Sequence, residues 1–529
     1  MSFGPTMMDT PLTIDWIADR AERWMADGEV ISRRPDRSMS RTTYGALIPR
    51  ARKLARALVG AGVKPGERIA TLMWNHAEHL EAYFGIPLAG AVLHTLNLRL
   101  HPDEIAFIAS DAGDRMVIVD DVLLPLLEKV IAAGAKFERV FVVGGDGSYE
   151  ALLAGAPDVA LPALREQDAL GVCYTSGTTG RPKGVVYSQR STLLHTLVVA
   201  LPDSLNVART DVLLPVVPMF HVNAWGLPYV CAMTGAKLVF PGPYLDPPSL
   251  LELMQNEQVT VAAGVPTIWI GIRDVLEANP GAYSLRSGIR MIVGGSAAPE
   301  KLIRDFDRLG LRLLHAWGMT ETSPVGTVSR LSPELERADL DTQYQQRAKQ
   351  GRPVPLVELR VRNDQGDVPA DGKTSGELLV RGPWIASAYA GGHTPERWTD
   401  DGFFRTGDVA RLDAHGYIQL TDRIADLIKS GGEWIASQEL ENALMGHPHV
   451  KEAAVIGCLH PKWGERPLAA GVLKDGVTCT AEELKAFLTP KFAKYWLPDA
   501  FVFVEAIPRT SAGKFKKTEL RETFRDWKW

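Results

Sequence analysis

The sequence predicts an α/β protein with a large N-terminal part, a barrel-like segment after it and a small α+β unit at the C-terminus. The chain of 529 residues is longer than one hydrophobic core usually supports, so we expect two or more domains. Apolar β-branched runs alternate with helix-period segments over roughly the first 310 residues, which indicates parallel sheets covered on both faces. After about residue 356 the hydrophobic period changes to two.

The N-terminal part alternates strands and helices along the chain. Apolar residues recur at helical spacing from Leu47 to Leu58, and Gly62 with Pro65 ends that helix. A strand at 68–73 and a helix at 79–88 follow. Further strands are expected at 116–119, 140–143, 170–174, 212–217, 237–240, 259–262, 290–293 and 312–314, with helices at 249–255 and 300–309.

The C-terminal third has a different pattern. Segments 356–361, 375–381 and 402–420 alternate at period two between Gly/Asp turns, which is typical of antiparallel or barrel-like strands. After Asp422-Arg423, helices at 437–445 and 481–490 and strands at 453–456, 468–473 and 501–504 make a compact set. We therefore predict a boundary between a domain of residues 1–422 and one of residues 423–529.

Composition and charge narrow the function classes. A hydrophobic content of 46%, 23% charged residues and a net charge of −5 give no reason to expect nucleic acid as a partner. No stretch has the length of an integral membrane segment and no secretory signal is evident, so the cytoplasm is the expected location. The scattered cysteines, without a CxxC pair or a histidine at metal-ligand spacing, suggest reduced thiols rather than a disulfide frame or zinc site: Cys173, Cys231, Cys458 and Cys479.

The most informative motif is residues 174–184, Tyr-Thr-Ser-Gly-Thr-Thr-Gly-Arg-Pro-Lys-Gly, directly after an expected strand. Glycines let backbone N–H groups approach a ligand, and hydroxyls and an ammonium add donors without a nearby acid. The loop suits polyphosphate oxygens, although it lacks the Walker A spacing. A solvated turn is the alternative. The candidate phosphate-binding residues are Thr175, Ser176, Gly177, Thr178, Thr179, Gly180 and Lys183.

Two further motifs carry acidic residues. Glu321 follows Thr320, and a carboxylate beside a hydroxyl near a phosphate loop suits Mg²⁺. Trp317, beside Gly318, either stacks on a planar base or packs in the core. Asp408 either holds both hydroxyls of a ribose or caps a turn.

The last motifs lie after the predicted boundary. The charged pair Asp422-Arg423 indicates a hinge. The double glycine Gly431-Gly432 indicates a loop after it that comes close to a narrow passage. Lys514 lies on a glycine-bearing turn, where its flexible stem suits it to neutralise a phosphoryl oxyanion. A solvated basic tail is the alternative.

These motifs occur in one order, and from about residue 40 to 520 the chain resembles the adenylate-forming superfamily of acyl-CoA synthetases, luciferases and adenylation domains. Segments 218–226 (Pro-Met-Phe-His-Val-Asn-Ala-Trp-Gly) and 431–435 (Gly-Gly-Glu-Trp-Ile), with Trp317, resemble fatty-acyl-CoA and 3-methylmercaptopropionate-type CoA ligases. The resemblance implies two doubly wound sheets plus a β-barrel-like subdomain, and a small mobile α+β C-terminal domain. It implies that a small-molecule carboxylic acid attacks MgATP to give acyl-AMP and pyrophosphate, and that coenzyme A then displaces AMP.

The resemblance also implies roles. The loop from Thr175 to Lys183 holds the β- and γ-phosphates, Glu321 with Thr175 holds Mg²⁺, and Thr320 faces the α-phosphate. Asp408 and Arg423 hold the ribose, and Lys514 bridges carboxylate and phosphate. The remaining nucleotide and coenzyme A candidates are Gly295, Ser296, Ala297, Ala298, Pro299, Ala316, Trp317, Gly318, Met319, Gly431, Gly432 and Glu433. His221 is implied to lie beside the acyl pocket as a catalytic residue, and a hydrogen-bonded structural histidine is the alternative. The acyl-pocket candidates, with no charged group among them, are Trp225, Val261, Gly264, Val265, Gly295, Gly318 and Trp317.

One position departs from the family pattern. The family usually has Asp or Lys two residues after the hinge arginine, and this chain has Ala425. Either the pivot lies at a neighbouring residue, or the alanine is a changed residue that favours one conformation. The alternative functions are a luciferase-like or carrier-loading enzyme, and a nucleotide-binding regulator that has lost catalysis. A homodimer is implied by the family alone.

Overall fold

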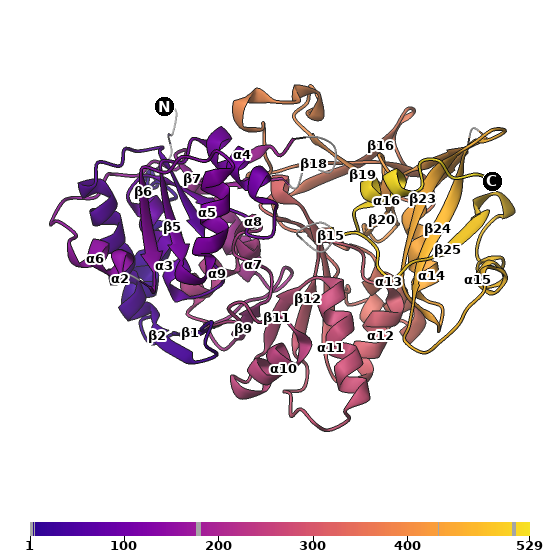
Figure 1. Ribbon diagram of the computed structural model, residues 1–529, viewed down its shortest axis with the longest axis horizontal. Helices are drawn as coiled ribbons and strands as arrows, with labels where there is room; N and C mark the ends of the chain where they lie inside the picture. Colours follow the sequence, from indigo (N-terminus) through magenta and orange to yellow (C-terminus); the bar gives the residue numbers. More distant parts are fainter. Residues whose placement is uncertain (1–3, 5, 146, 176–180, 432, 510–514) are drawn as a thin grey trace.

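The computed structural model describes residues 4, 6–145, 147–175, 181–431, 433–509 and 515–529, and the strands of this part form four sheets (Figure 1). The largest sheet is central. Its order is β15 (Arg352–Pro353), β14 (Val325–Val328), β13 (Arg312–Gly318), β12 (Arg290–Val293), β11 (Val261–Gly264), β9 (Val212–Pro215), β10 (Lys237–Phe240), β1 (Glu29–Arg33) and β2 (Met39–Thr43). Strands β1 and β9 to β13 pair in parallel, whereas β2, β14 and β15 are antiparallel.

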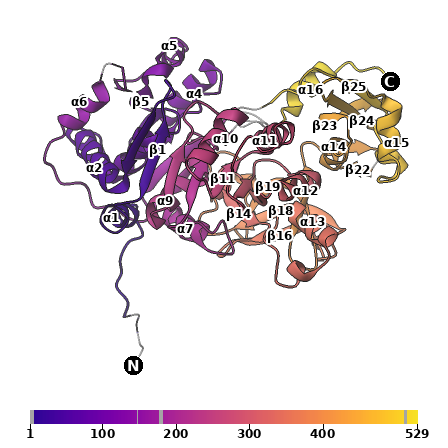
Figure 2. The same ribbon diagram turned by 90° about the horizontal axis from the view of Figure 1, so that it is seen from below.

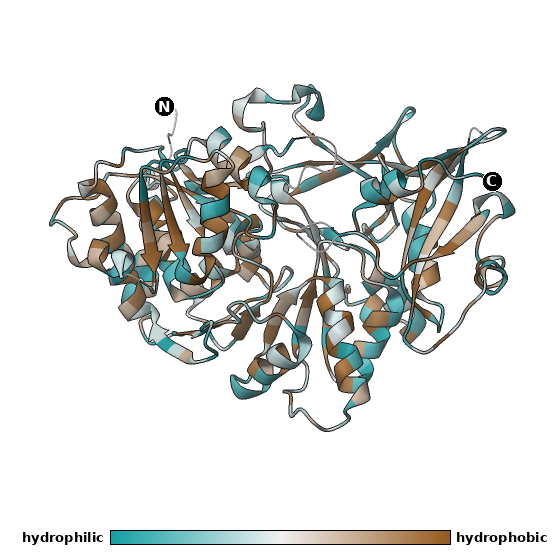
Figure 3. Ribbon diagram, viewed as in Figure 1, coloured by the Kyte–Doolittle hydropathy of each residue, from teal (hydrophilic) through white to brown (hydrophobic). Residues whose placement is uncertain are grey.

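The second sheet is N-terminal. Its order is β6 (Arg139–Val143), β5 (Met116–Asp120), β3 (Arg68–Leu72), β4 (Val92–Thr95), β7 (Ala169–Tyr174) and β8 (Gly184–Ser188), parallel except for β8. The segment between β7 and β8 contains the predicted phosphate loop. Figure 3 colours the middle of this sheet as strongly hydrophobic, and every residue of β5 is buried.

Helices cover both of these sheets and create the cores between the layers. One core lies between the two sheets and receives α1 (Asp15–Arg23), α2 (Tyr44–Gly60), α3 (Ala77–Leu88), α6 (Ser148–Ala154), α7 (Gln189–Ala200), α8 (Val222–Trp225) and α9 (Leu227–Thr234). A second core lies under α10 (Pro247–Asn256), α11 (Pro266–Ala278), α12 (Glu300–Arg308) and α13 (Leu340–Ala348). A third lies under α4 (Pro102–Ala112) and α5 (Leu124–Ala132).

The remaining sheets follow along the chain. The antiparallel one is ordered β17 (Gly366–Asp367), β16 (Glu358–Asn363), β18 (Ser375–Arg381), β19 (Phe404–Leu412) and β20 (Ile418–Arg423). The C-terminal one is ordered β22 (Glu433–Ile435), β21 (Ile428–Ser430), β24 (Gly464–Leu473) and β23 (Val450–His460), with β25 (Ala500–Phe503) beside β24. It packs with α14 (Ser437–Met445), α15 (Ala481–Leu488) and α16 (Lys517–Thr523). Figures 1 and 2 place this C-terminal part at the opposite end of the molecule from α2 and α6.

The predicted fold class is confirmed, with differences at particular strands. Strand β11 begins two residues later than expected, because Gln258 has a φ of 55° and the Val259 N–H still bonds to the Met254 carbonyl. Strand β13 continues past Leu314 to Gly318, because it pairs with β14, a strand that sequence patterns did not indicate.

The predicted boundary after residue 422 falls at the end of β20, next to the change of sheet. Rotation of two domains about this point stays a prediction. Among the helices of the described part, none has both the length and the apolarity needed to cross a bilayer.

Candidate active site

A buried carboxylate anchors the site. Asp408 on β19 is only 3% exposed. Its Oδ2 accepts a hydrogen bond of 2.9 Å from the indole N–H of Trp317, and its Oδ1 lies 2.9 Å from Arg423 Nε. Asp408 is the main cause that raises the pKa of Arg423, with further contributions from Glu321, Asp426 and Asp422. A buried acid held by two donors is a fixed, oriented acceptor, as a ribose site requires.

Trp317 reaches Asp408 because β13 and β14 pair closely. A Cβ added at Gly326 would lie 2.5 Å from the Trp317 ring, and one added at Gly318 would lie 1.7 Å from the Pro324 carbonyl oxygen. Both glycines therefore allow close approach of the backbone. Of the two predicted roles of Trp317, packing is visible here. Stacking on a base, and a place for Gly318 in the acyl pocket, stay predictions.

A second cluster surrounds Glu321, which is 5% exposed in the middle of a short 3₁₀ turn (Thr320–Thr322). The Tyr389 hydroxyl donates a 2.5 Å hydrogen bond to Glu321 Oε1. The Lys183 ammonium lies 5.2 Å from the centre of the Tyr389 ring, and the Lys183 N–H donates to Thr175 Oγ1 at 3.2 Å. Tyr389 thus joins the end of the phosphate loop to the acidic residue.

Thr320 is fixed beside this cluster, because the Tyr187 hydroxyl donates a 2.9 Å hydrogen bond to its carbonyl oxygen. Several predicted residues fall outside the part of the chain that the structure describes: Ser176, Gly177, Thr178, Thr179, Gly180, Gly432 and Lys514. The roles of these residues stay predictions.

The predicted nucleotide loop, residues 295–299, follows β12 and is divided between two cavities. Ala297, Ala298 and Pro299 line a cavity of about 310 Å³ that is also lined by Asn442 and Ala443 of α14. The predicted nucleotide loop therefore borders the C-terminal part. Nearby, Ala316 pairs with Val328 across β13 and β14, and the Met319 N–H donates to Thr322 Oγ1 at 2.9 Å. Ser296 is exposed on the same loop.

A narrow cavity of about 30 Å³ is lined by several of the residues predicted for the acyl pocket. It brings together these residues: Arg99, Val216, Val217, Pro218, His221, Trp225, Gly264, Val265, Ile268 and Gly295. Five of them are predicted for catalysis or the acyl pocket: His221, Trp225, Gly264, Val265 and Gly295. Arg99 is not, and it adds a cation to a pocket expected to be uncharged; burial lowers its pKa. Its loop sequence, Asn-Leu-Arg after β4, gives no signal of this position.

The wall of this cavity contains the short element α8, whose backbone is a left-handed turn rather than an α-helix. Residues Val222, Asn223, Ala224 and Trp225 have φ values of 46°, 49°, 47° and 59°. Each non-glycine residue in this conformation costs about 1–2 kcal/mol, so the surrounding structure must hold the turn in place.

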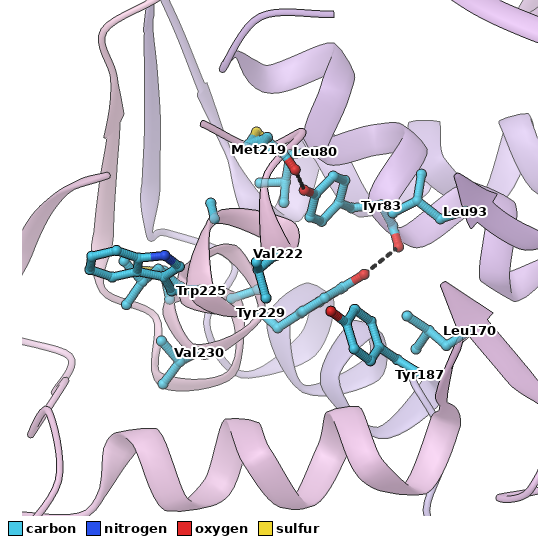
Figure 4. Close-up of a cluster of buried hydrophobic side chains, with 14 of the residues drawn as sticks. Leu80, Tyr83, Leu93, Leu170, Tyr187, Met219, Val222, Trp225, Tyr229 and Val230 are labelled. Atoms are coloured by element: carbon cyan, nitrogen blue, oxygen red, sulfur yellow. Dashed lines mark hydrogen bonds between the residues drawn. The ribbon is translucent and has the colours of Figure 1, made fainter. Parts of the chain in front are cut away.

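Side-chain and backbone contacts hold the turn. Asn223 Oδ1 accepts hydrogen bonds from Cys173 Sγ at 3.3 Å and Thr95 Oγ1 at 3.5 Å. Figure 4 shows Val222 and Trp225 on this turn among Tyr83, Met219 and Tyr229, with the Tyr83 hydroxyl bonded to the Met219 carbonyl. The turn thus links Trp225, a predicted acyl-pocket residue, to β7, the strand before the predicted phosphate loop.

Gly294 lies between Trp225, which lines the narrow cavity, and Ala316 of strand β13. A Cβ at this position would lie 3.0 Å from the Trp225 ring and 3.4 Å from the Ala316 carbonyl oxygen. The narrow cavity and strand β13, which carries Trp317, are therefore separated by the thickness of one glycine.

Hydrogen bonds and ion pairs hold the predicted hinge region in this conformation. Asp422 Oδ2 accepts from the Ser437 hydroxyl at 2.7 Å, and Arg521 pairs with Asp426 at 2.6 Å. Arg521 also donates to the Ala425 carbonyl at 3.3 Å. Lys517 pairs with Glu441 at 2.6 Å.

The predicted coenzyme A loop belongs to the β21–β22 hairpin. Gly431 has a φ of 62°, and its N–H bonds to the Trp463 carbonyl at 2.8 Å. Glu433 is exposed. No described residue of this hairpin lines either of the two cavities. In this conformation the hairpin does not contribute to them.

Comparison with known proteins identifies the family to which the chain belongs. The pattern of the AMP-binding enzyme family matches residues 17–390, and that of the AMP-binding enzyme C-terminal domain matches residues 439–514. The chain therefore belongs to the family of AMP-binding enzymes, and the predicted membership of the adenylate-forming superfamily is confirmed.

Individual relatives match over nearly the whole length. A long-chain-fatty-acid–CoA ligase of Thermus thermophilus is 49% identical over 99% of this chain and 98% of its own. A 3-methylmercaptopropionyl-CoA ligase of Ruegeria pomeroyi is 43% identical over 98% of both chains.

Solved structures agree with this assignment. The anthranilate CoA ligase AuaEII, in complex with anthranoyl-AMP, has a TM-score of 0.85 and 25% identity over 98% of both chains. ATP-bound MatB from Rhodopseudomonas palustris has a TM-score of 0.81 and 27% identity over 97% of this chain and 99% of its own.

Proposed function

We propose that the chain is an ATP-dependent acid–thiol ligase that forms acyl-CoA through an acyl-AMP intermediate and releases AMP and pyrophosphate. The observation that carries the proposal is the anchored carboxylate of Asp408, which is held by Arg423 and by Trp317 of β13, the strand next to the narrow cavity. The CoA ligases that match over nearly the whole chain support the choice of coenzyme A as second acceptor.

In the first half-reaction a carboxylate oxygen of the acid attacks the α-phosphorus of ATP, and the bond to the bridging oxygen breaks as pyrophosphate leaves. Asp408 and Arg423 hold the ribose, and Lys183 lies where a cation offsets charge on the leaving phosphates. Thr320 faces the α-phosphate, and Lys514 meets the reacting oxygens. In the second half-reaction the coenzyme A sulfur attacks the acyl carbon, and the bond from this carbon to the AMP oxygen breaks.

The residues around the phosphate loop fit Mg²⁺. Glu321 offers a carboxylate and Thr175 a hydroxyl within one cluster, and Mg²⁺ binds through one or two carboxylates together with substrate phosphates. These two residues would hold the ion, which neutralises charge on the phosphate oxygens when bound.

The acid is proposed to be aliphatic or a thioether, either a fatty acid or a small alkyl acid. The cavity between His221, Trp225 and Val265 is mostly apolar, and relatives are named for long-chain and medium-chain fatty acids and for 3-methylmercaptopropionate. A volume of about 30 Å³ holds little more than a water molecule. An alkyl chain therefore requires Trp225 or Ile268 to move aside.

The second half-reaction is proposed to need rotation of residues 423–529 about the segment after Arg423, which brings Gly431, Gly432 and Glu433 to the site. The position of Gly431 against Trp463, away from both cavities, supports a conformation that precedes this step. We also propose a cytoplasmic location and a homodimer, and light scattering measures the oligomeric state.

The test is a panel of acids assayed for pyrophosphate release with and without coenzyme A, with the thioester measured by mass spectrometry. The panel contains straight-chain fatty acids of increasing length, 3-methylmercaptopropionate, benzoate and an amino acid. We expect equal amounts of pyrophosphate and acyl-CoA from the aliphatic or thioether acids. Pyrophosphate without thioester would indicate another second half-reaction, and no pyrophosphate with any acid would refute the proposal.

A further inference from the structure

The C-terminal part brings together a second set of side chains that are able to bind a metal ion. They are distant in sequence from the residues assigned above to ATP. In the described part of the chain, His447, His449 and Cys479 each offer one ligand atom, and these atoms lie within 4.8 Å of one another. The histidines follow α14, and the cysteine lies two residues before α15. No short-range motif in the sequence connects them.

The backbone fixes this arrangement without help from a ligand. The His447 N–H bonds to the Leu444 carbonyl at 2.9 Å as α14 ends, and β23 begins at Val450. Strand β24 returns antiparallel beside β23, and the Lys474 N–H bonds to the His449 carbonyl at 2.9 Å. The turn that follows leads to Cys479. The sheet therefore preorganises the three side chains.

The polar atoms of this cluster are incompletely satisfied. His449 Nδ1 is buried and has no hydrogen-bond partner in the described part of the structure. Buried polar atoms of this kind are rare and cost about 1–3 kcal/mol when unpaired. Cys479 is 9% exposed, and its thiol makes a long 3.7 Å contact to the Thr480 carbonyl. The side chain of His447 is held edge-on against Phe487 at 4.9 Å.

The donor set selects the kind of ion. A thiolate and two imidazoles are ligands for Zn²⁺, whereas Mg²⁺ and Ca²⁺ take oxygen ligands. A tetrahedral ion needs one more ligand. The Glu483 carboxylate on the first turn of α15 is one source, because it interacts with the Cys479 thiol and also accepts from the Thr480 N–H at 2.8 Å. Water is the other source.

We propose that His447, His449 and Cys479 form a zinc site that ties the end of α14 to the start of α15. The ion would close the loop from His449 to Cys479 and so stabilise the C-terminal part, independently of the adenylation chemistry. Gly446, next to His447, lines the cavity shared with the large domain. The site therefore stiffens a segment beside the face that meets that domain.

The experiment uses the full-length enzyme without a polyhistidine tag, stripped of metal by a chelator and titrated with Zn²⁺ and with Co²⁺ as a spectroscopic probe. We expect one ion per chain and a thiolate-to-Co²⁺ charge-transfer band. Cys479→Ser should abolish the band and weaken Zn²⁺ binding by at least about tenfold, and His449→Gln should weaken it similarly. Zn²⁺ should raise the unfolding temperature of the wild type and not that of Cys479→Ser.

Cys458→Ser is the matched control, because Cys458 is another buried cysteine of the same C-terminal part. It should keep both the band and the affinity. Pyrophosphate release by zinc-free Cys479→Ser, assayed with Mg²⁺ and ATP, at the wild-type rate would show that this variant is folded. The proposal is overturned if the wild type binds no Zn²⁺, if Cys479→Ser retains the band, or if Cys458→Ser loses it.

Discussion

The indole N–H of Trp317 donates a 2.9 Å hydrogen bond to Asp408, and the other oxygen of that carboxylate lies 2.9 Å from Arg423 Nε. Three segments meet in this contact: β13 of the central sheet, β19 of the antiparallel sheet and the last residue of β20. Arg423 is also the residue from which the predicted hinge begins. The proposed ribose site and the predicted hinge are therefore parts of one structural unit.

Replacing Trp317 with Phe should raise the KM for ATP about tenfold with a smaller change in kcat. The variant leaves one oxygen of a buried carboxylate without its donor, which costs about 1–3 kcal/mol, and the ribose lies away from the reacting phosphorus. Steady-state kinetics measures both constants. Trp384→Phe is the control, because the Trp384 indole donates a 3.0 Å hydrogen bond to the Val325 carbonyl and is also buried. An equal rise in KM in both variants would contradict the role of Trp317.

Lys514→Ala should abolish acyl-AMP formation and leave transfer of a supplied acyl-AMP to coenzyme A largely intact. Lys514 is assigned to the charge that develops at the α-phosphate, which exists in the first half-reaction alone. Pyrophosphate exchange measures the first step, and thioester formation from synthetic acyl-AMP measures the second. Lys516→Ala, which breaks an exposed pair with Glu519, should change neither step. Equal loss of both steps in Lys514→Ala would refute the assignment.

Ala425→Lys should alter thioester formation more than adenylation. Ala425 lies in the hinge segment, and Arg521 holds it through its carbonyl and through Asp426. A second cation at this point weakens that contact and changes the balance between conformations. The two half-reactions are measured separately, as for Lys514. Equal changes in both rates would argue against a hinge at this residue.

Ala224→Gly should stabilise the protein by about 1 kcal/mol or leave it unchanged, because Ala224 has a φ of 47° and glycine adopts this conformation without steric cost. Urea unfolding measures the change. Ala151→Gly, on the exposed face of α6, is the control and should cost about 0.5–1 kcal/mol. Equal destabilisation in both variants would show that the turn at 222–225 is not strained.

His195→Gln should make the enzyme less sensitive to acid. Burial lowers the pKa of His195 to about 3 from 6.5, and its Nε2 accepts a 3.3 Å bond from the Val325 N–H. The neutral ring therefore stabilises the fold above pH 6.5, and this contribution is lost as the pH falls below that value. By pH 4.5 the loss is on the order of 2 kcal/mol.

Urea midpoints at pH 7 and 4.5 test this, and the midpoint of His195→Gln should fall less than that of the wild type. His101→Gln, at an exposed site, should follow the wild type. A parallel fall in all three proteins would remove His195 as a cause.

Much of the fold was predictable because its signals are local. The period-two pattern at 375–381 and the helical pattern at 437–445 coincide with β18 and α14. The motif residues proposed for the nucleotide site were chosen from their order along the chain, and their roles stay predictions. Tyr389 was not, because it lies 68 residues from its partner Glu321 and stands in no apolar or glycine-rich pattern.

The sequence also did not indicate the conformation of residues 222–225 in the wall of the predicted acyl pocket. Val222 is β-branched, and nothing in its own chemistry favours a φ of 46°. Its turn is held by contacts from Thr95 and Cys173, which are distant in sequence. Cys479 carries no sequence signal of a metal ligand, because spacing along the chain does not show that β24 returns beside His449.

The central claim is that the acid is activated as an acyl adenylate, and an isotope experiment tests it most directly. The enzyme is given an acid labelled with ¹⁸O in its carboxylate, together with ATP and coenzyme A, and the AMP produced is analysed by mass spectrometry. Attack of the carboxylate on the α-phosphorus, followed by cleavage at the acyl carbon, leaves one ¹⁸O on AMP. Label in AMP is the result we predict, and unlabelled AMP formed together with the thioester would contradict the account.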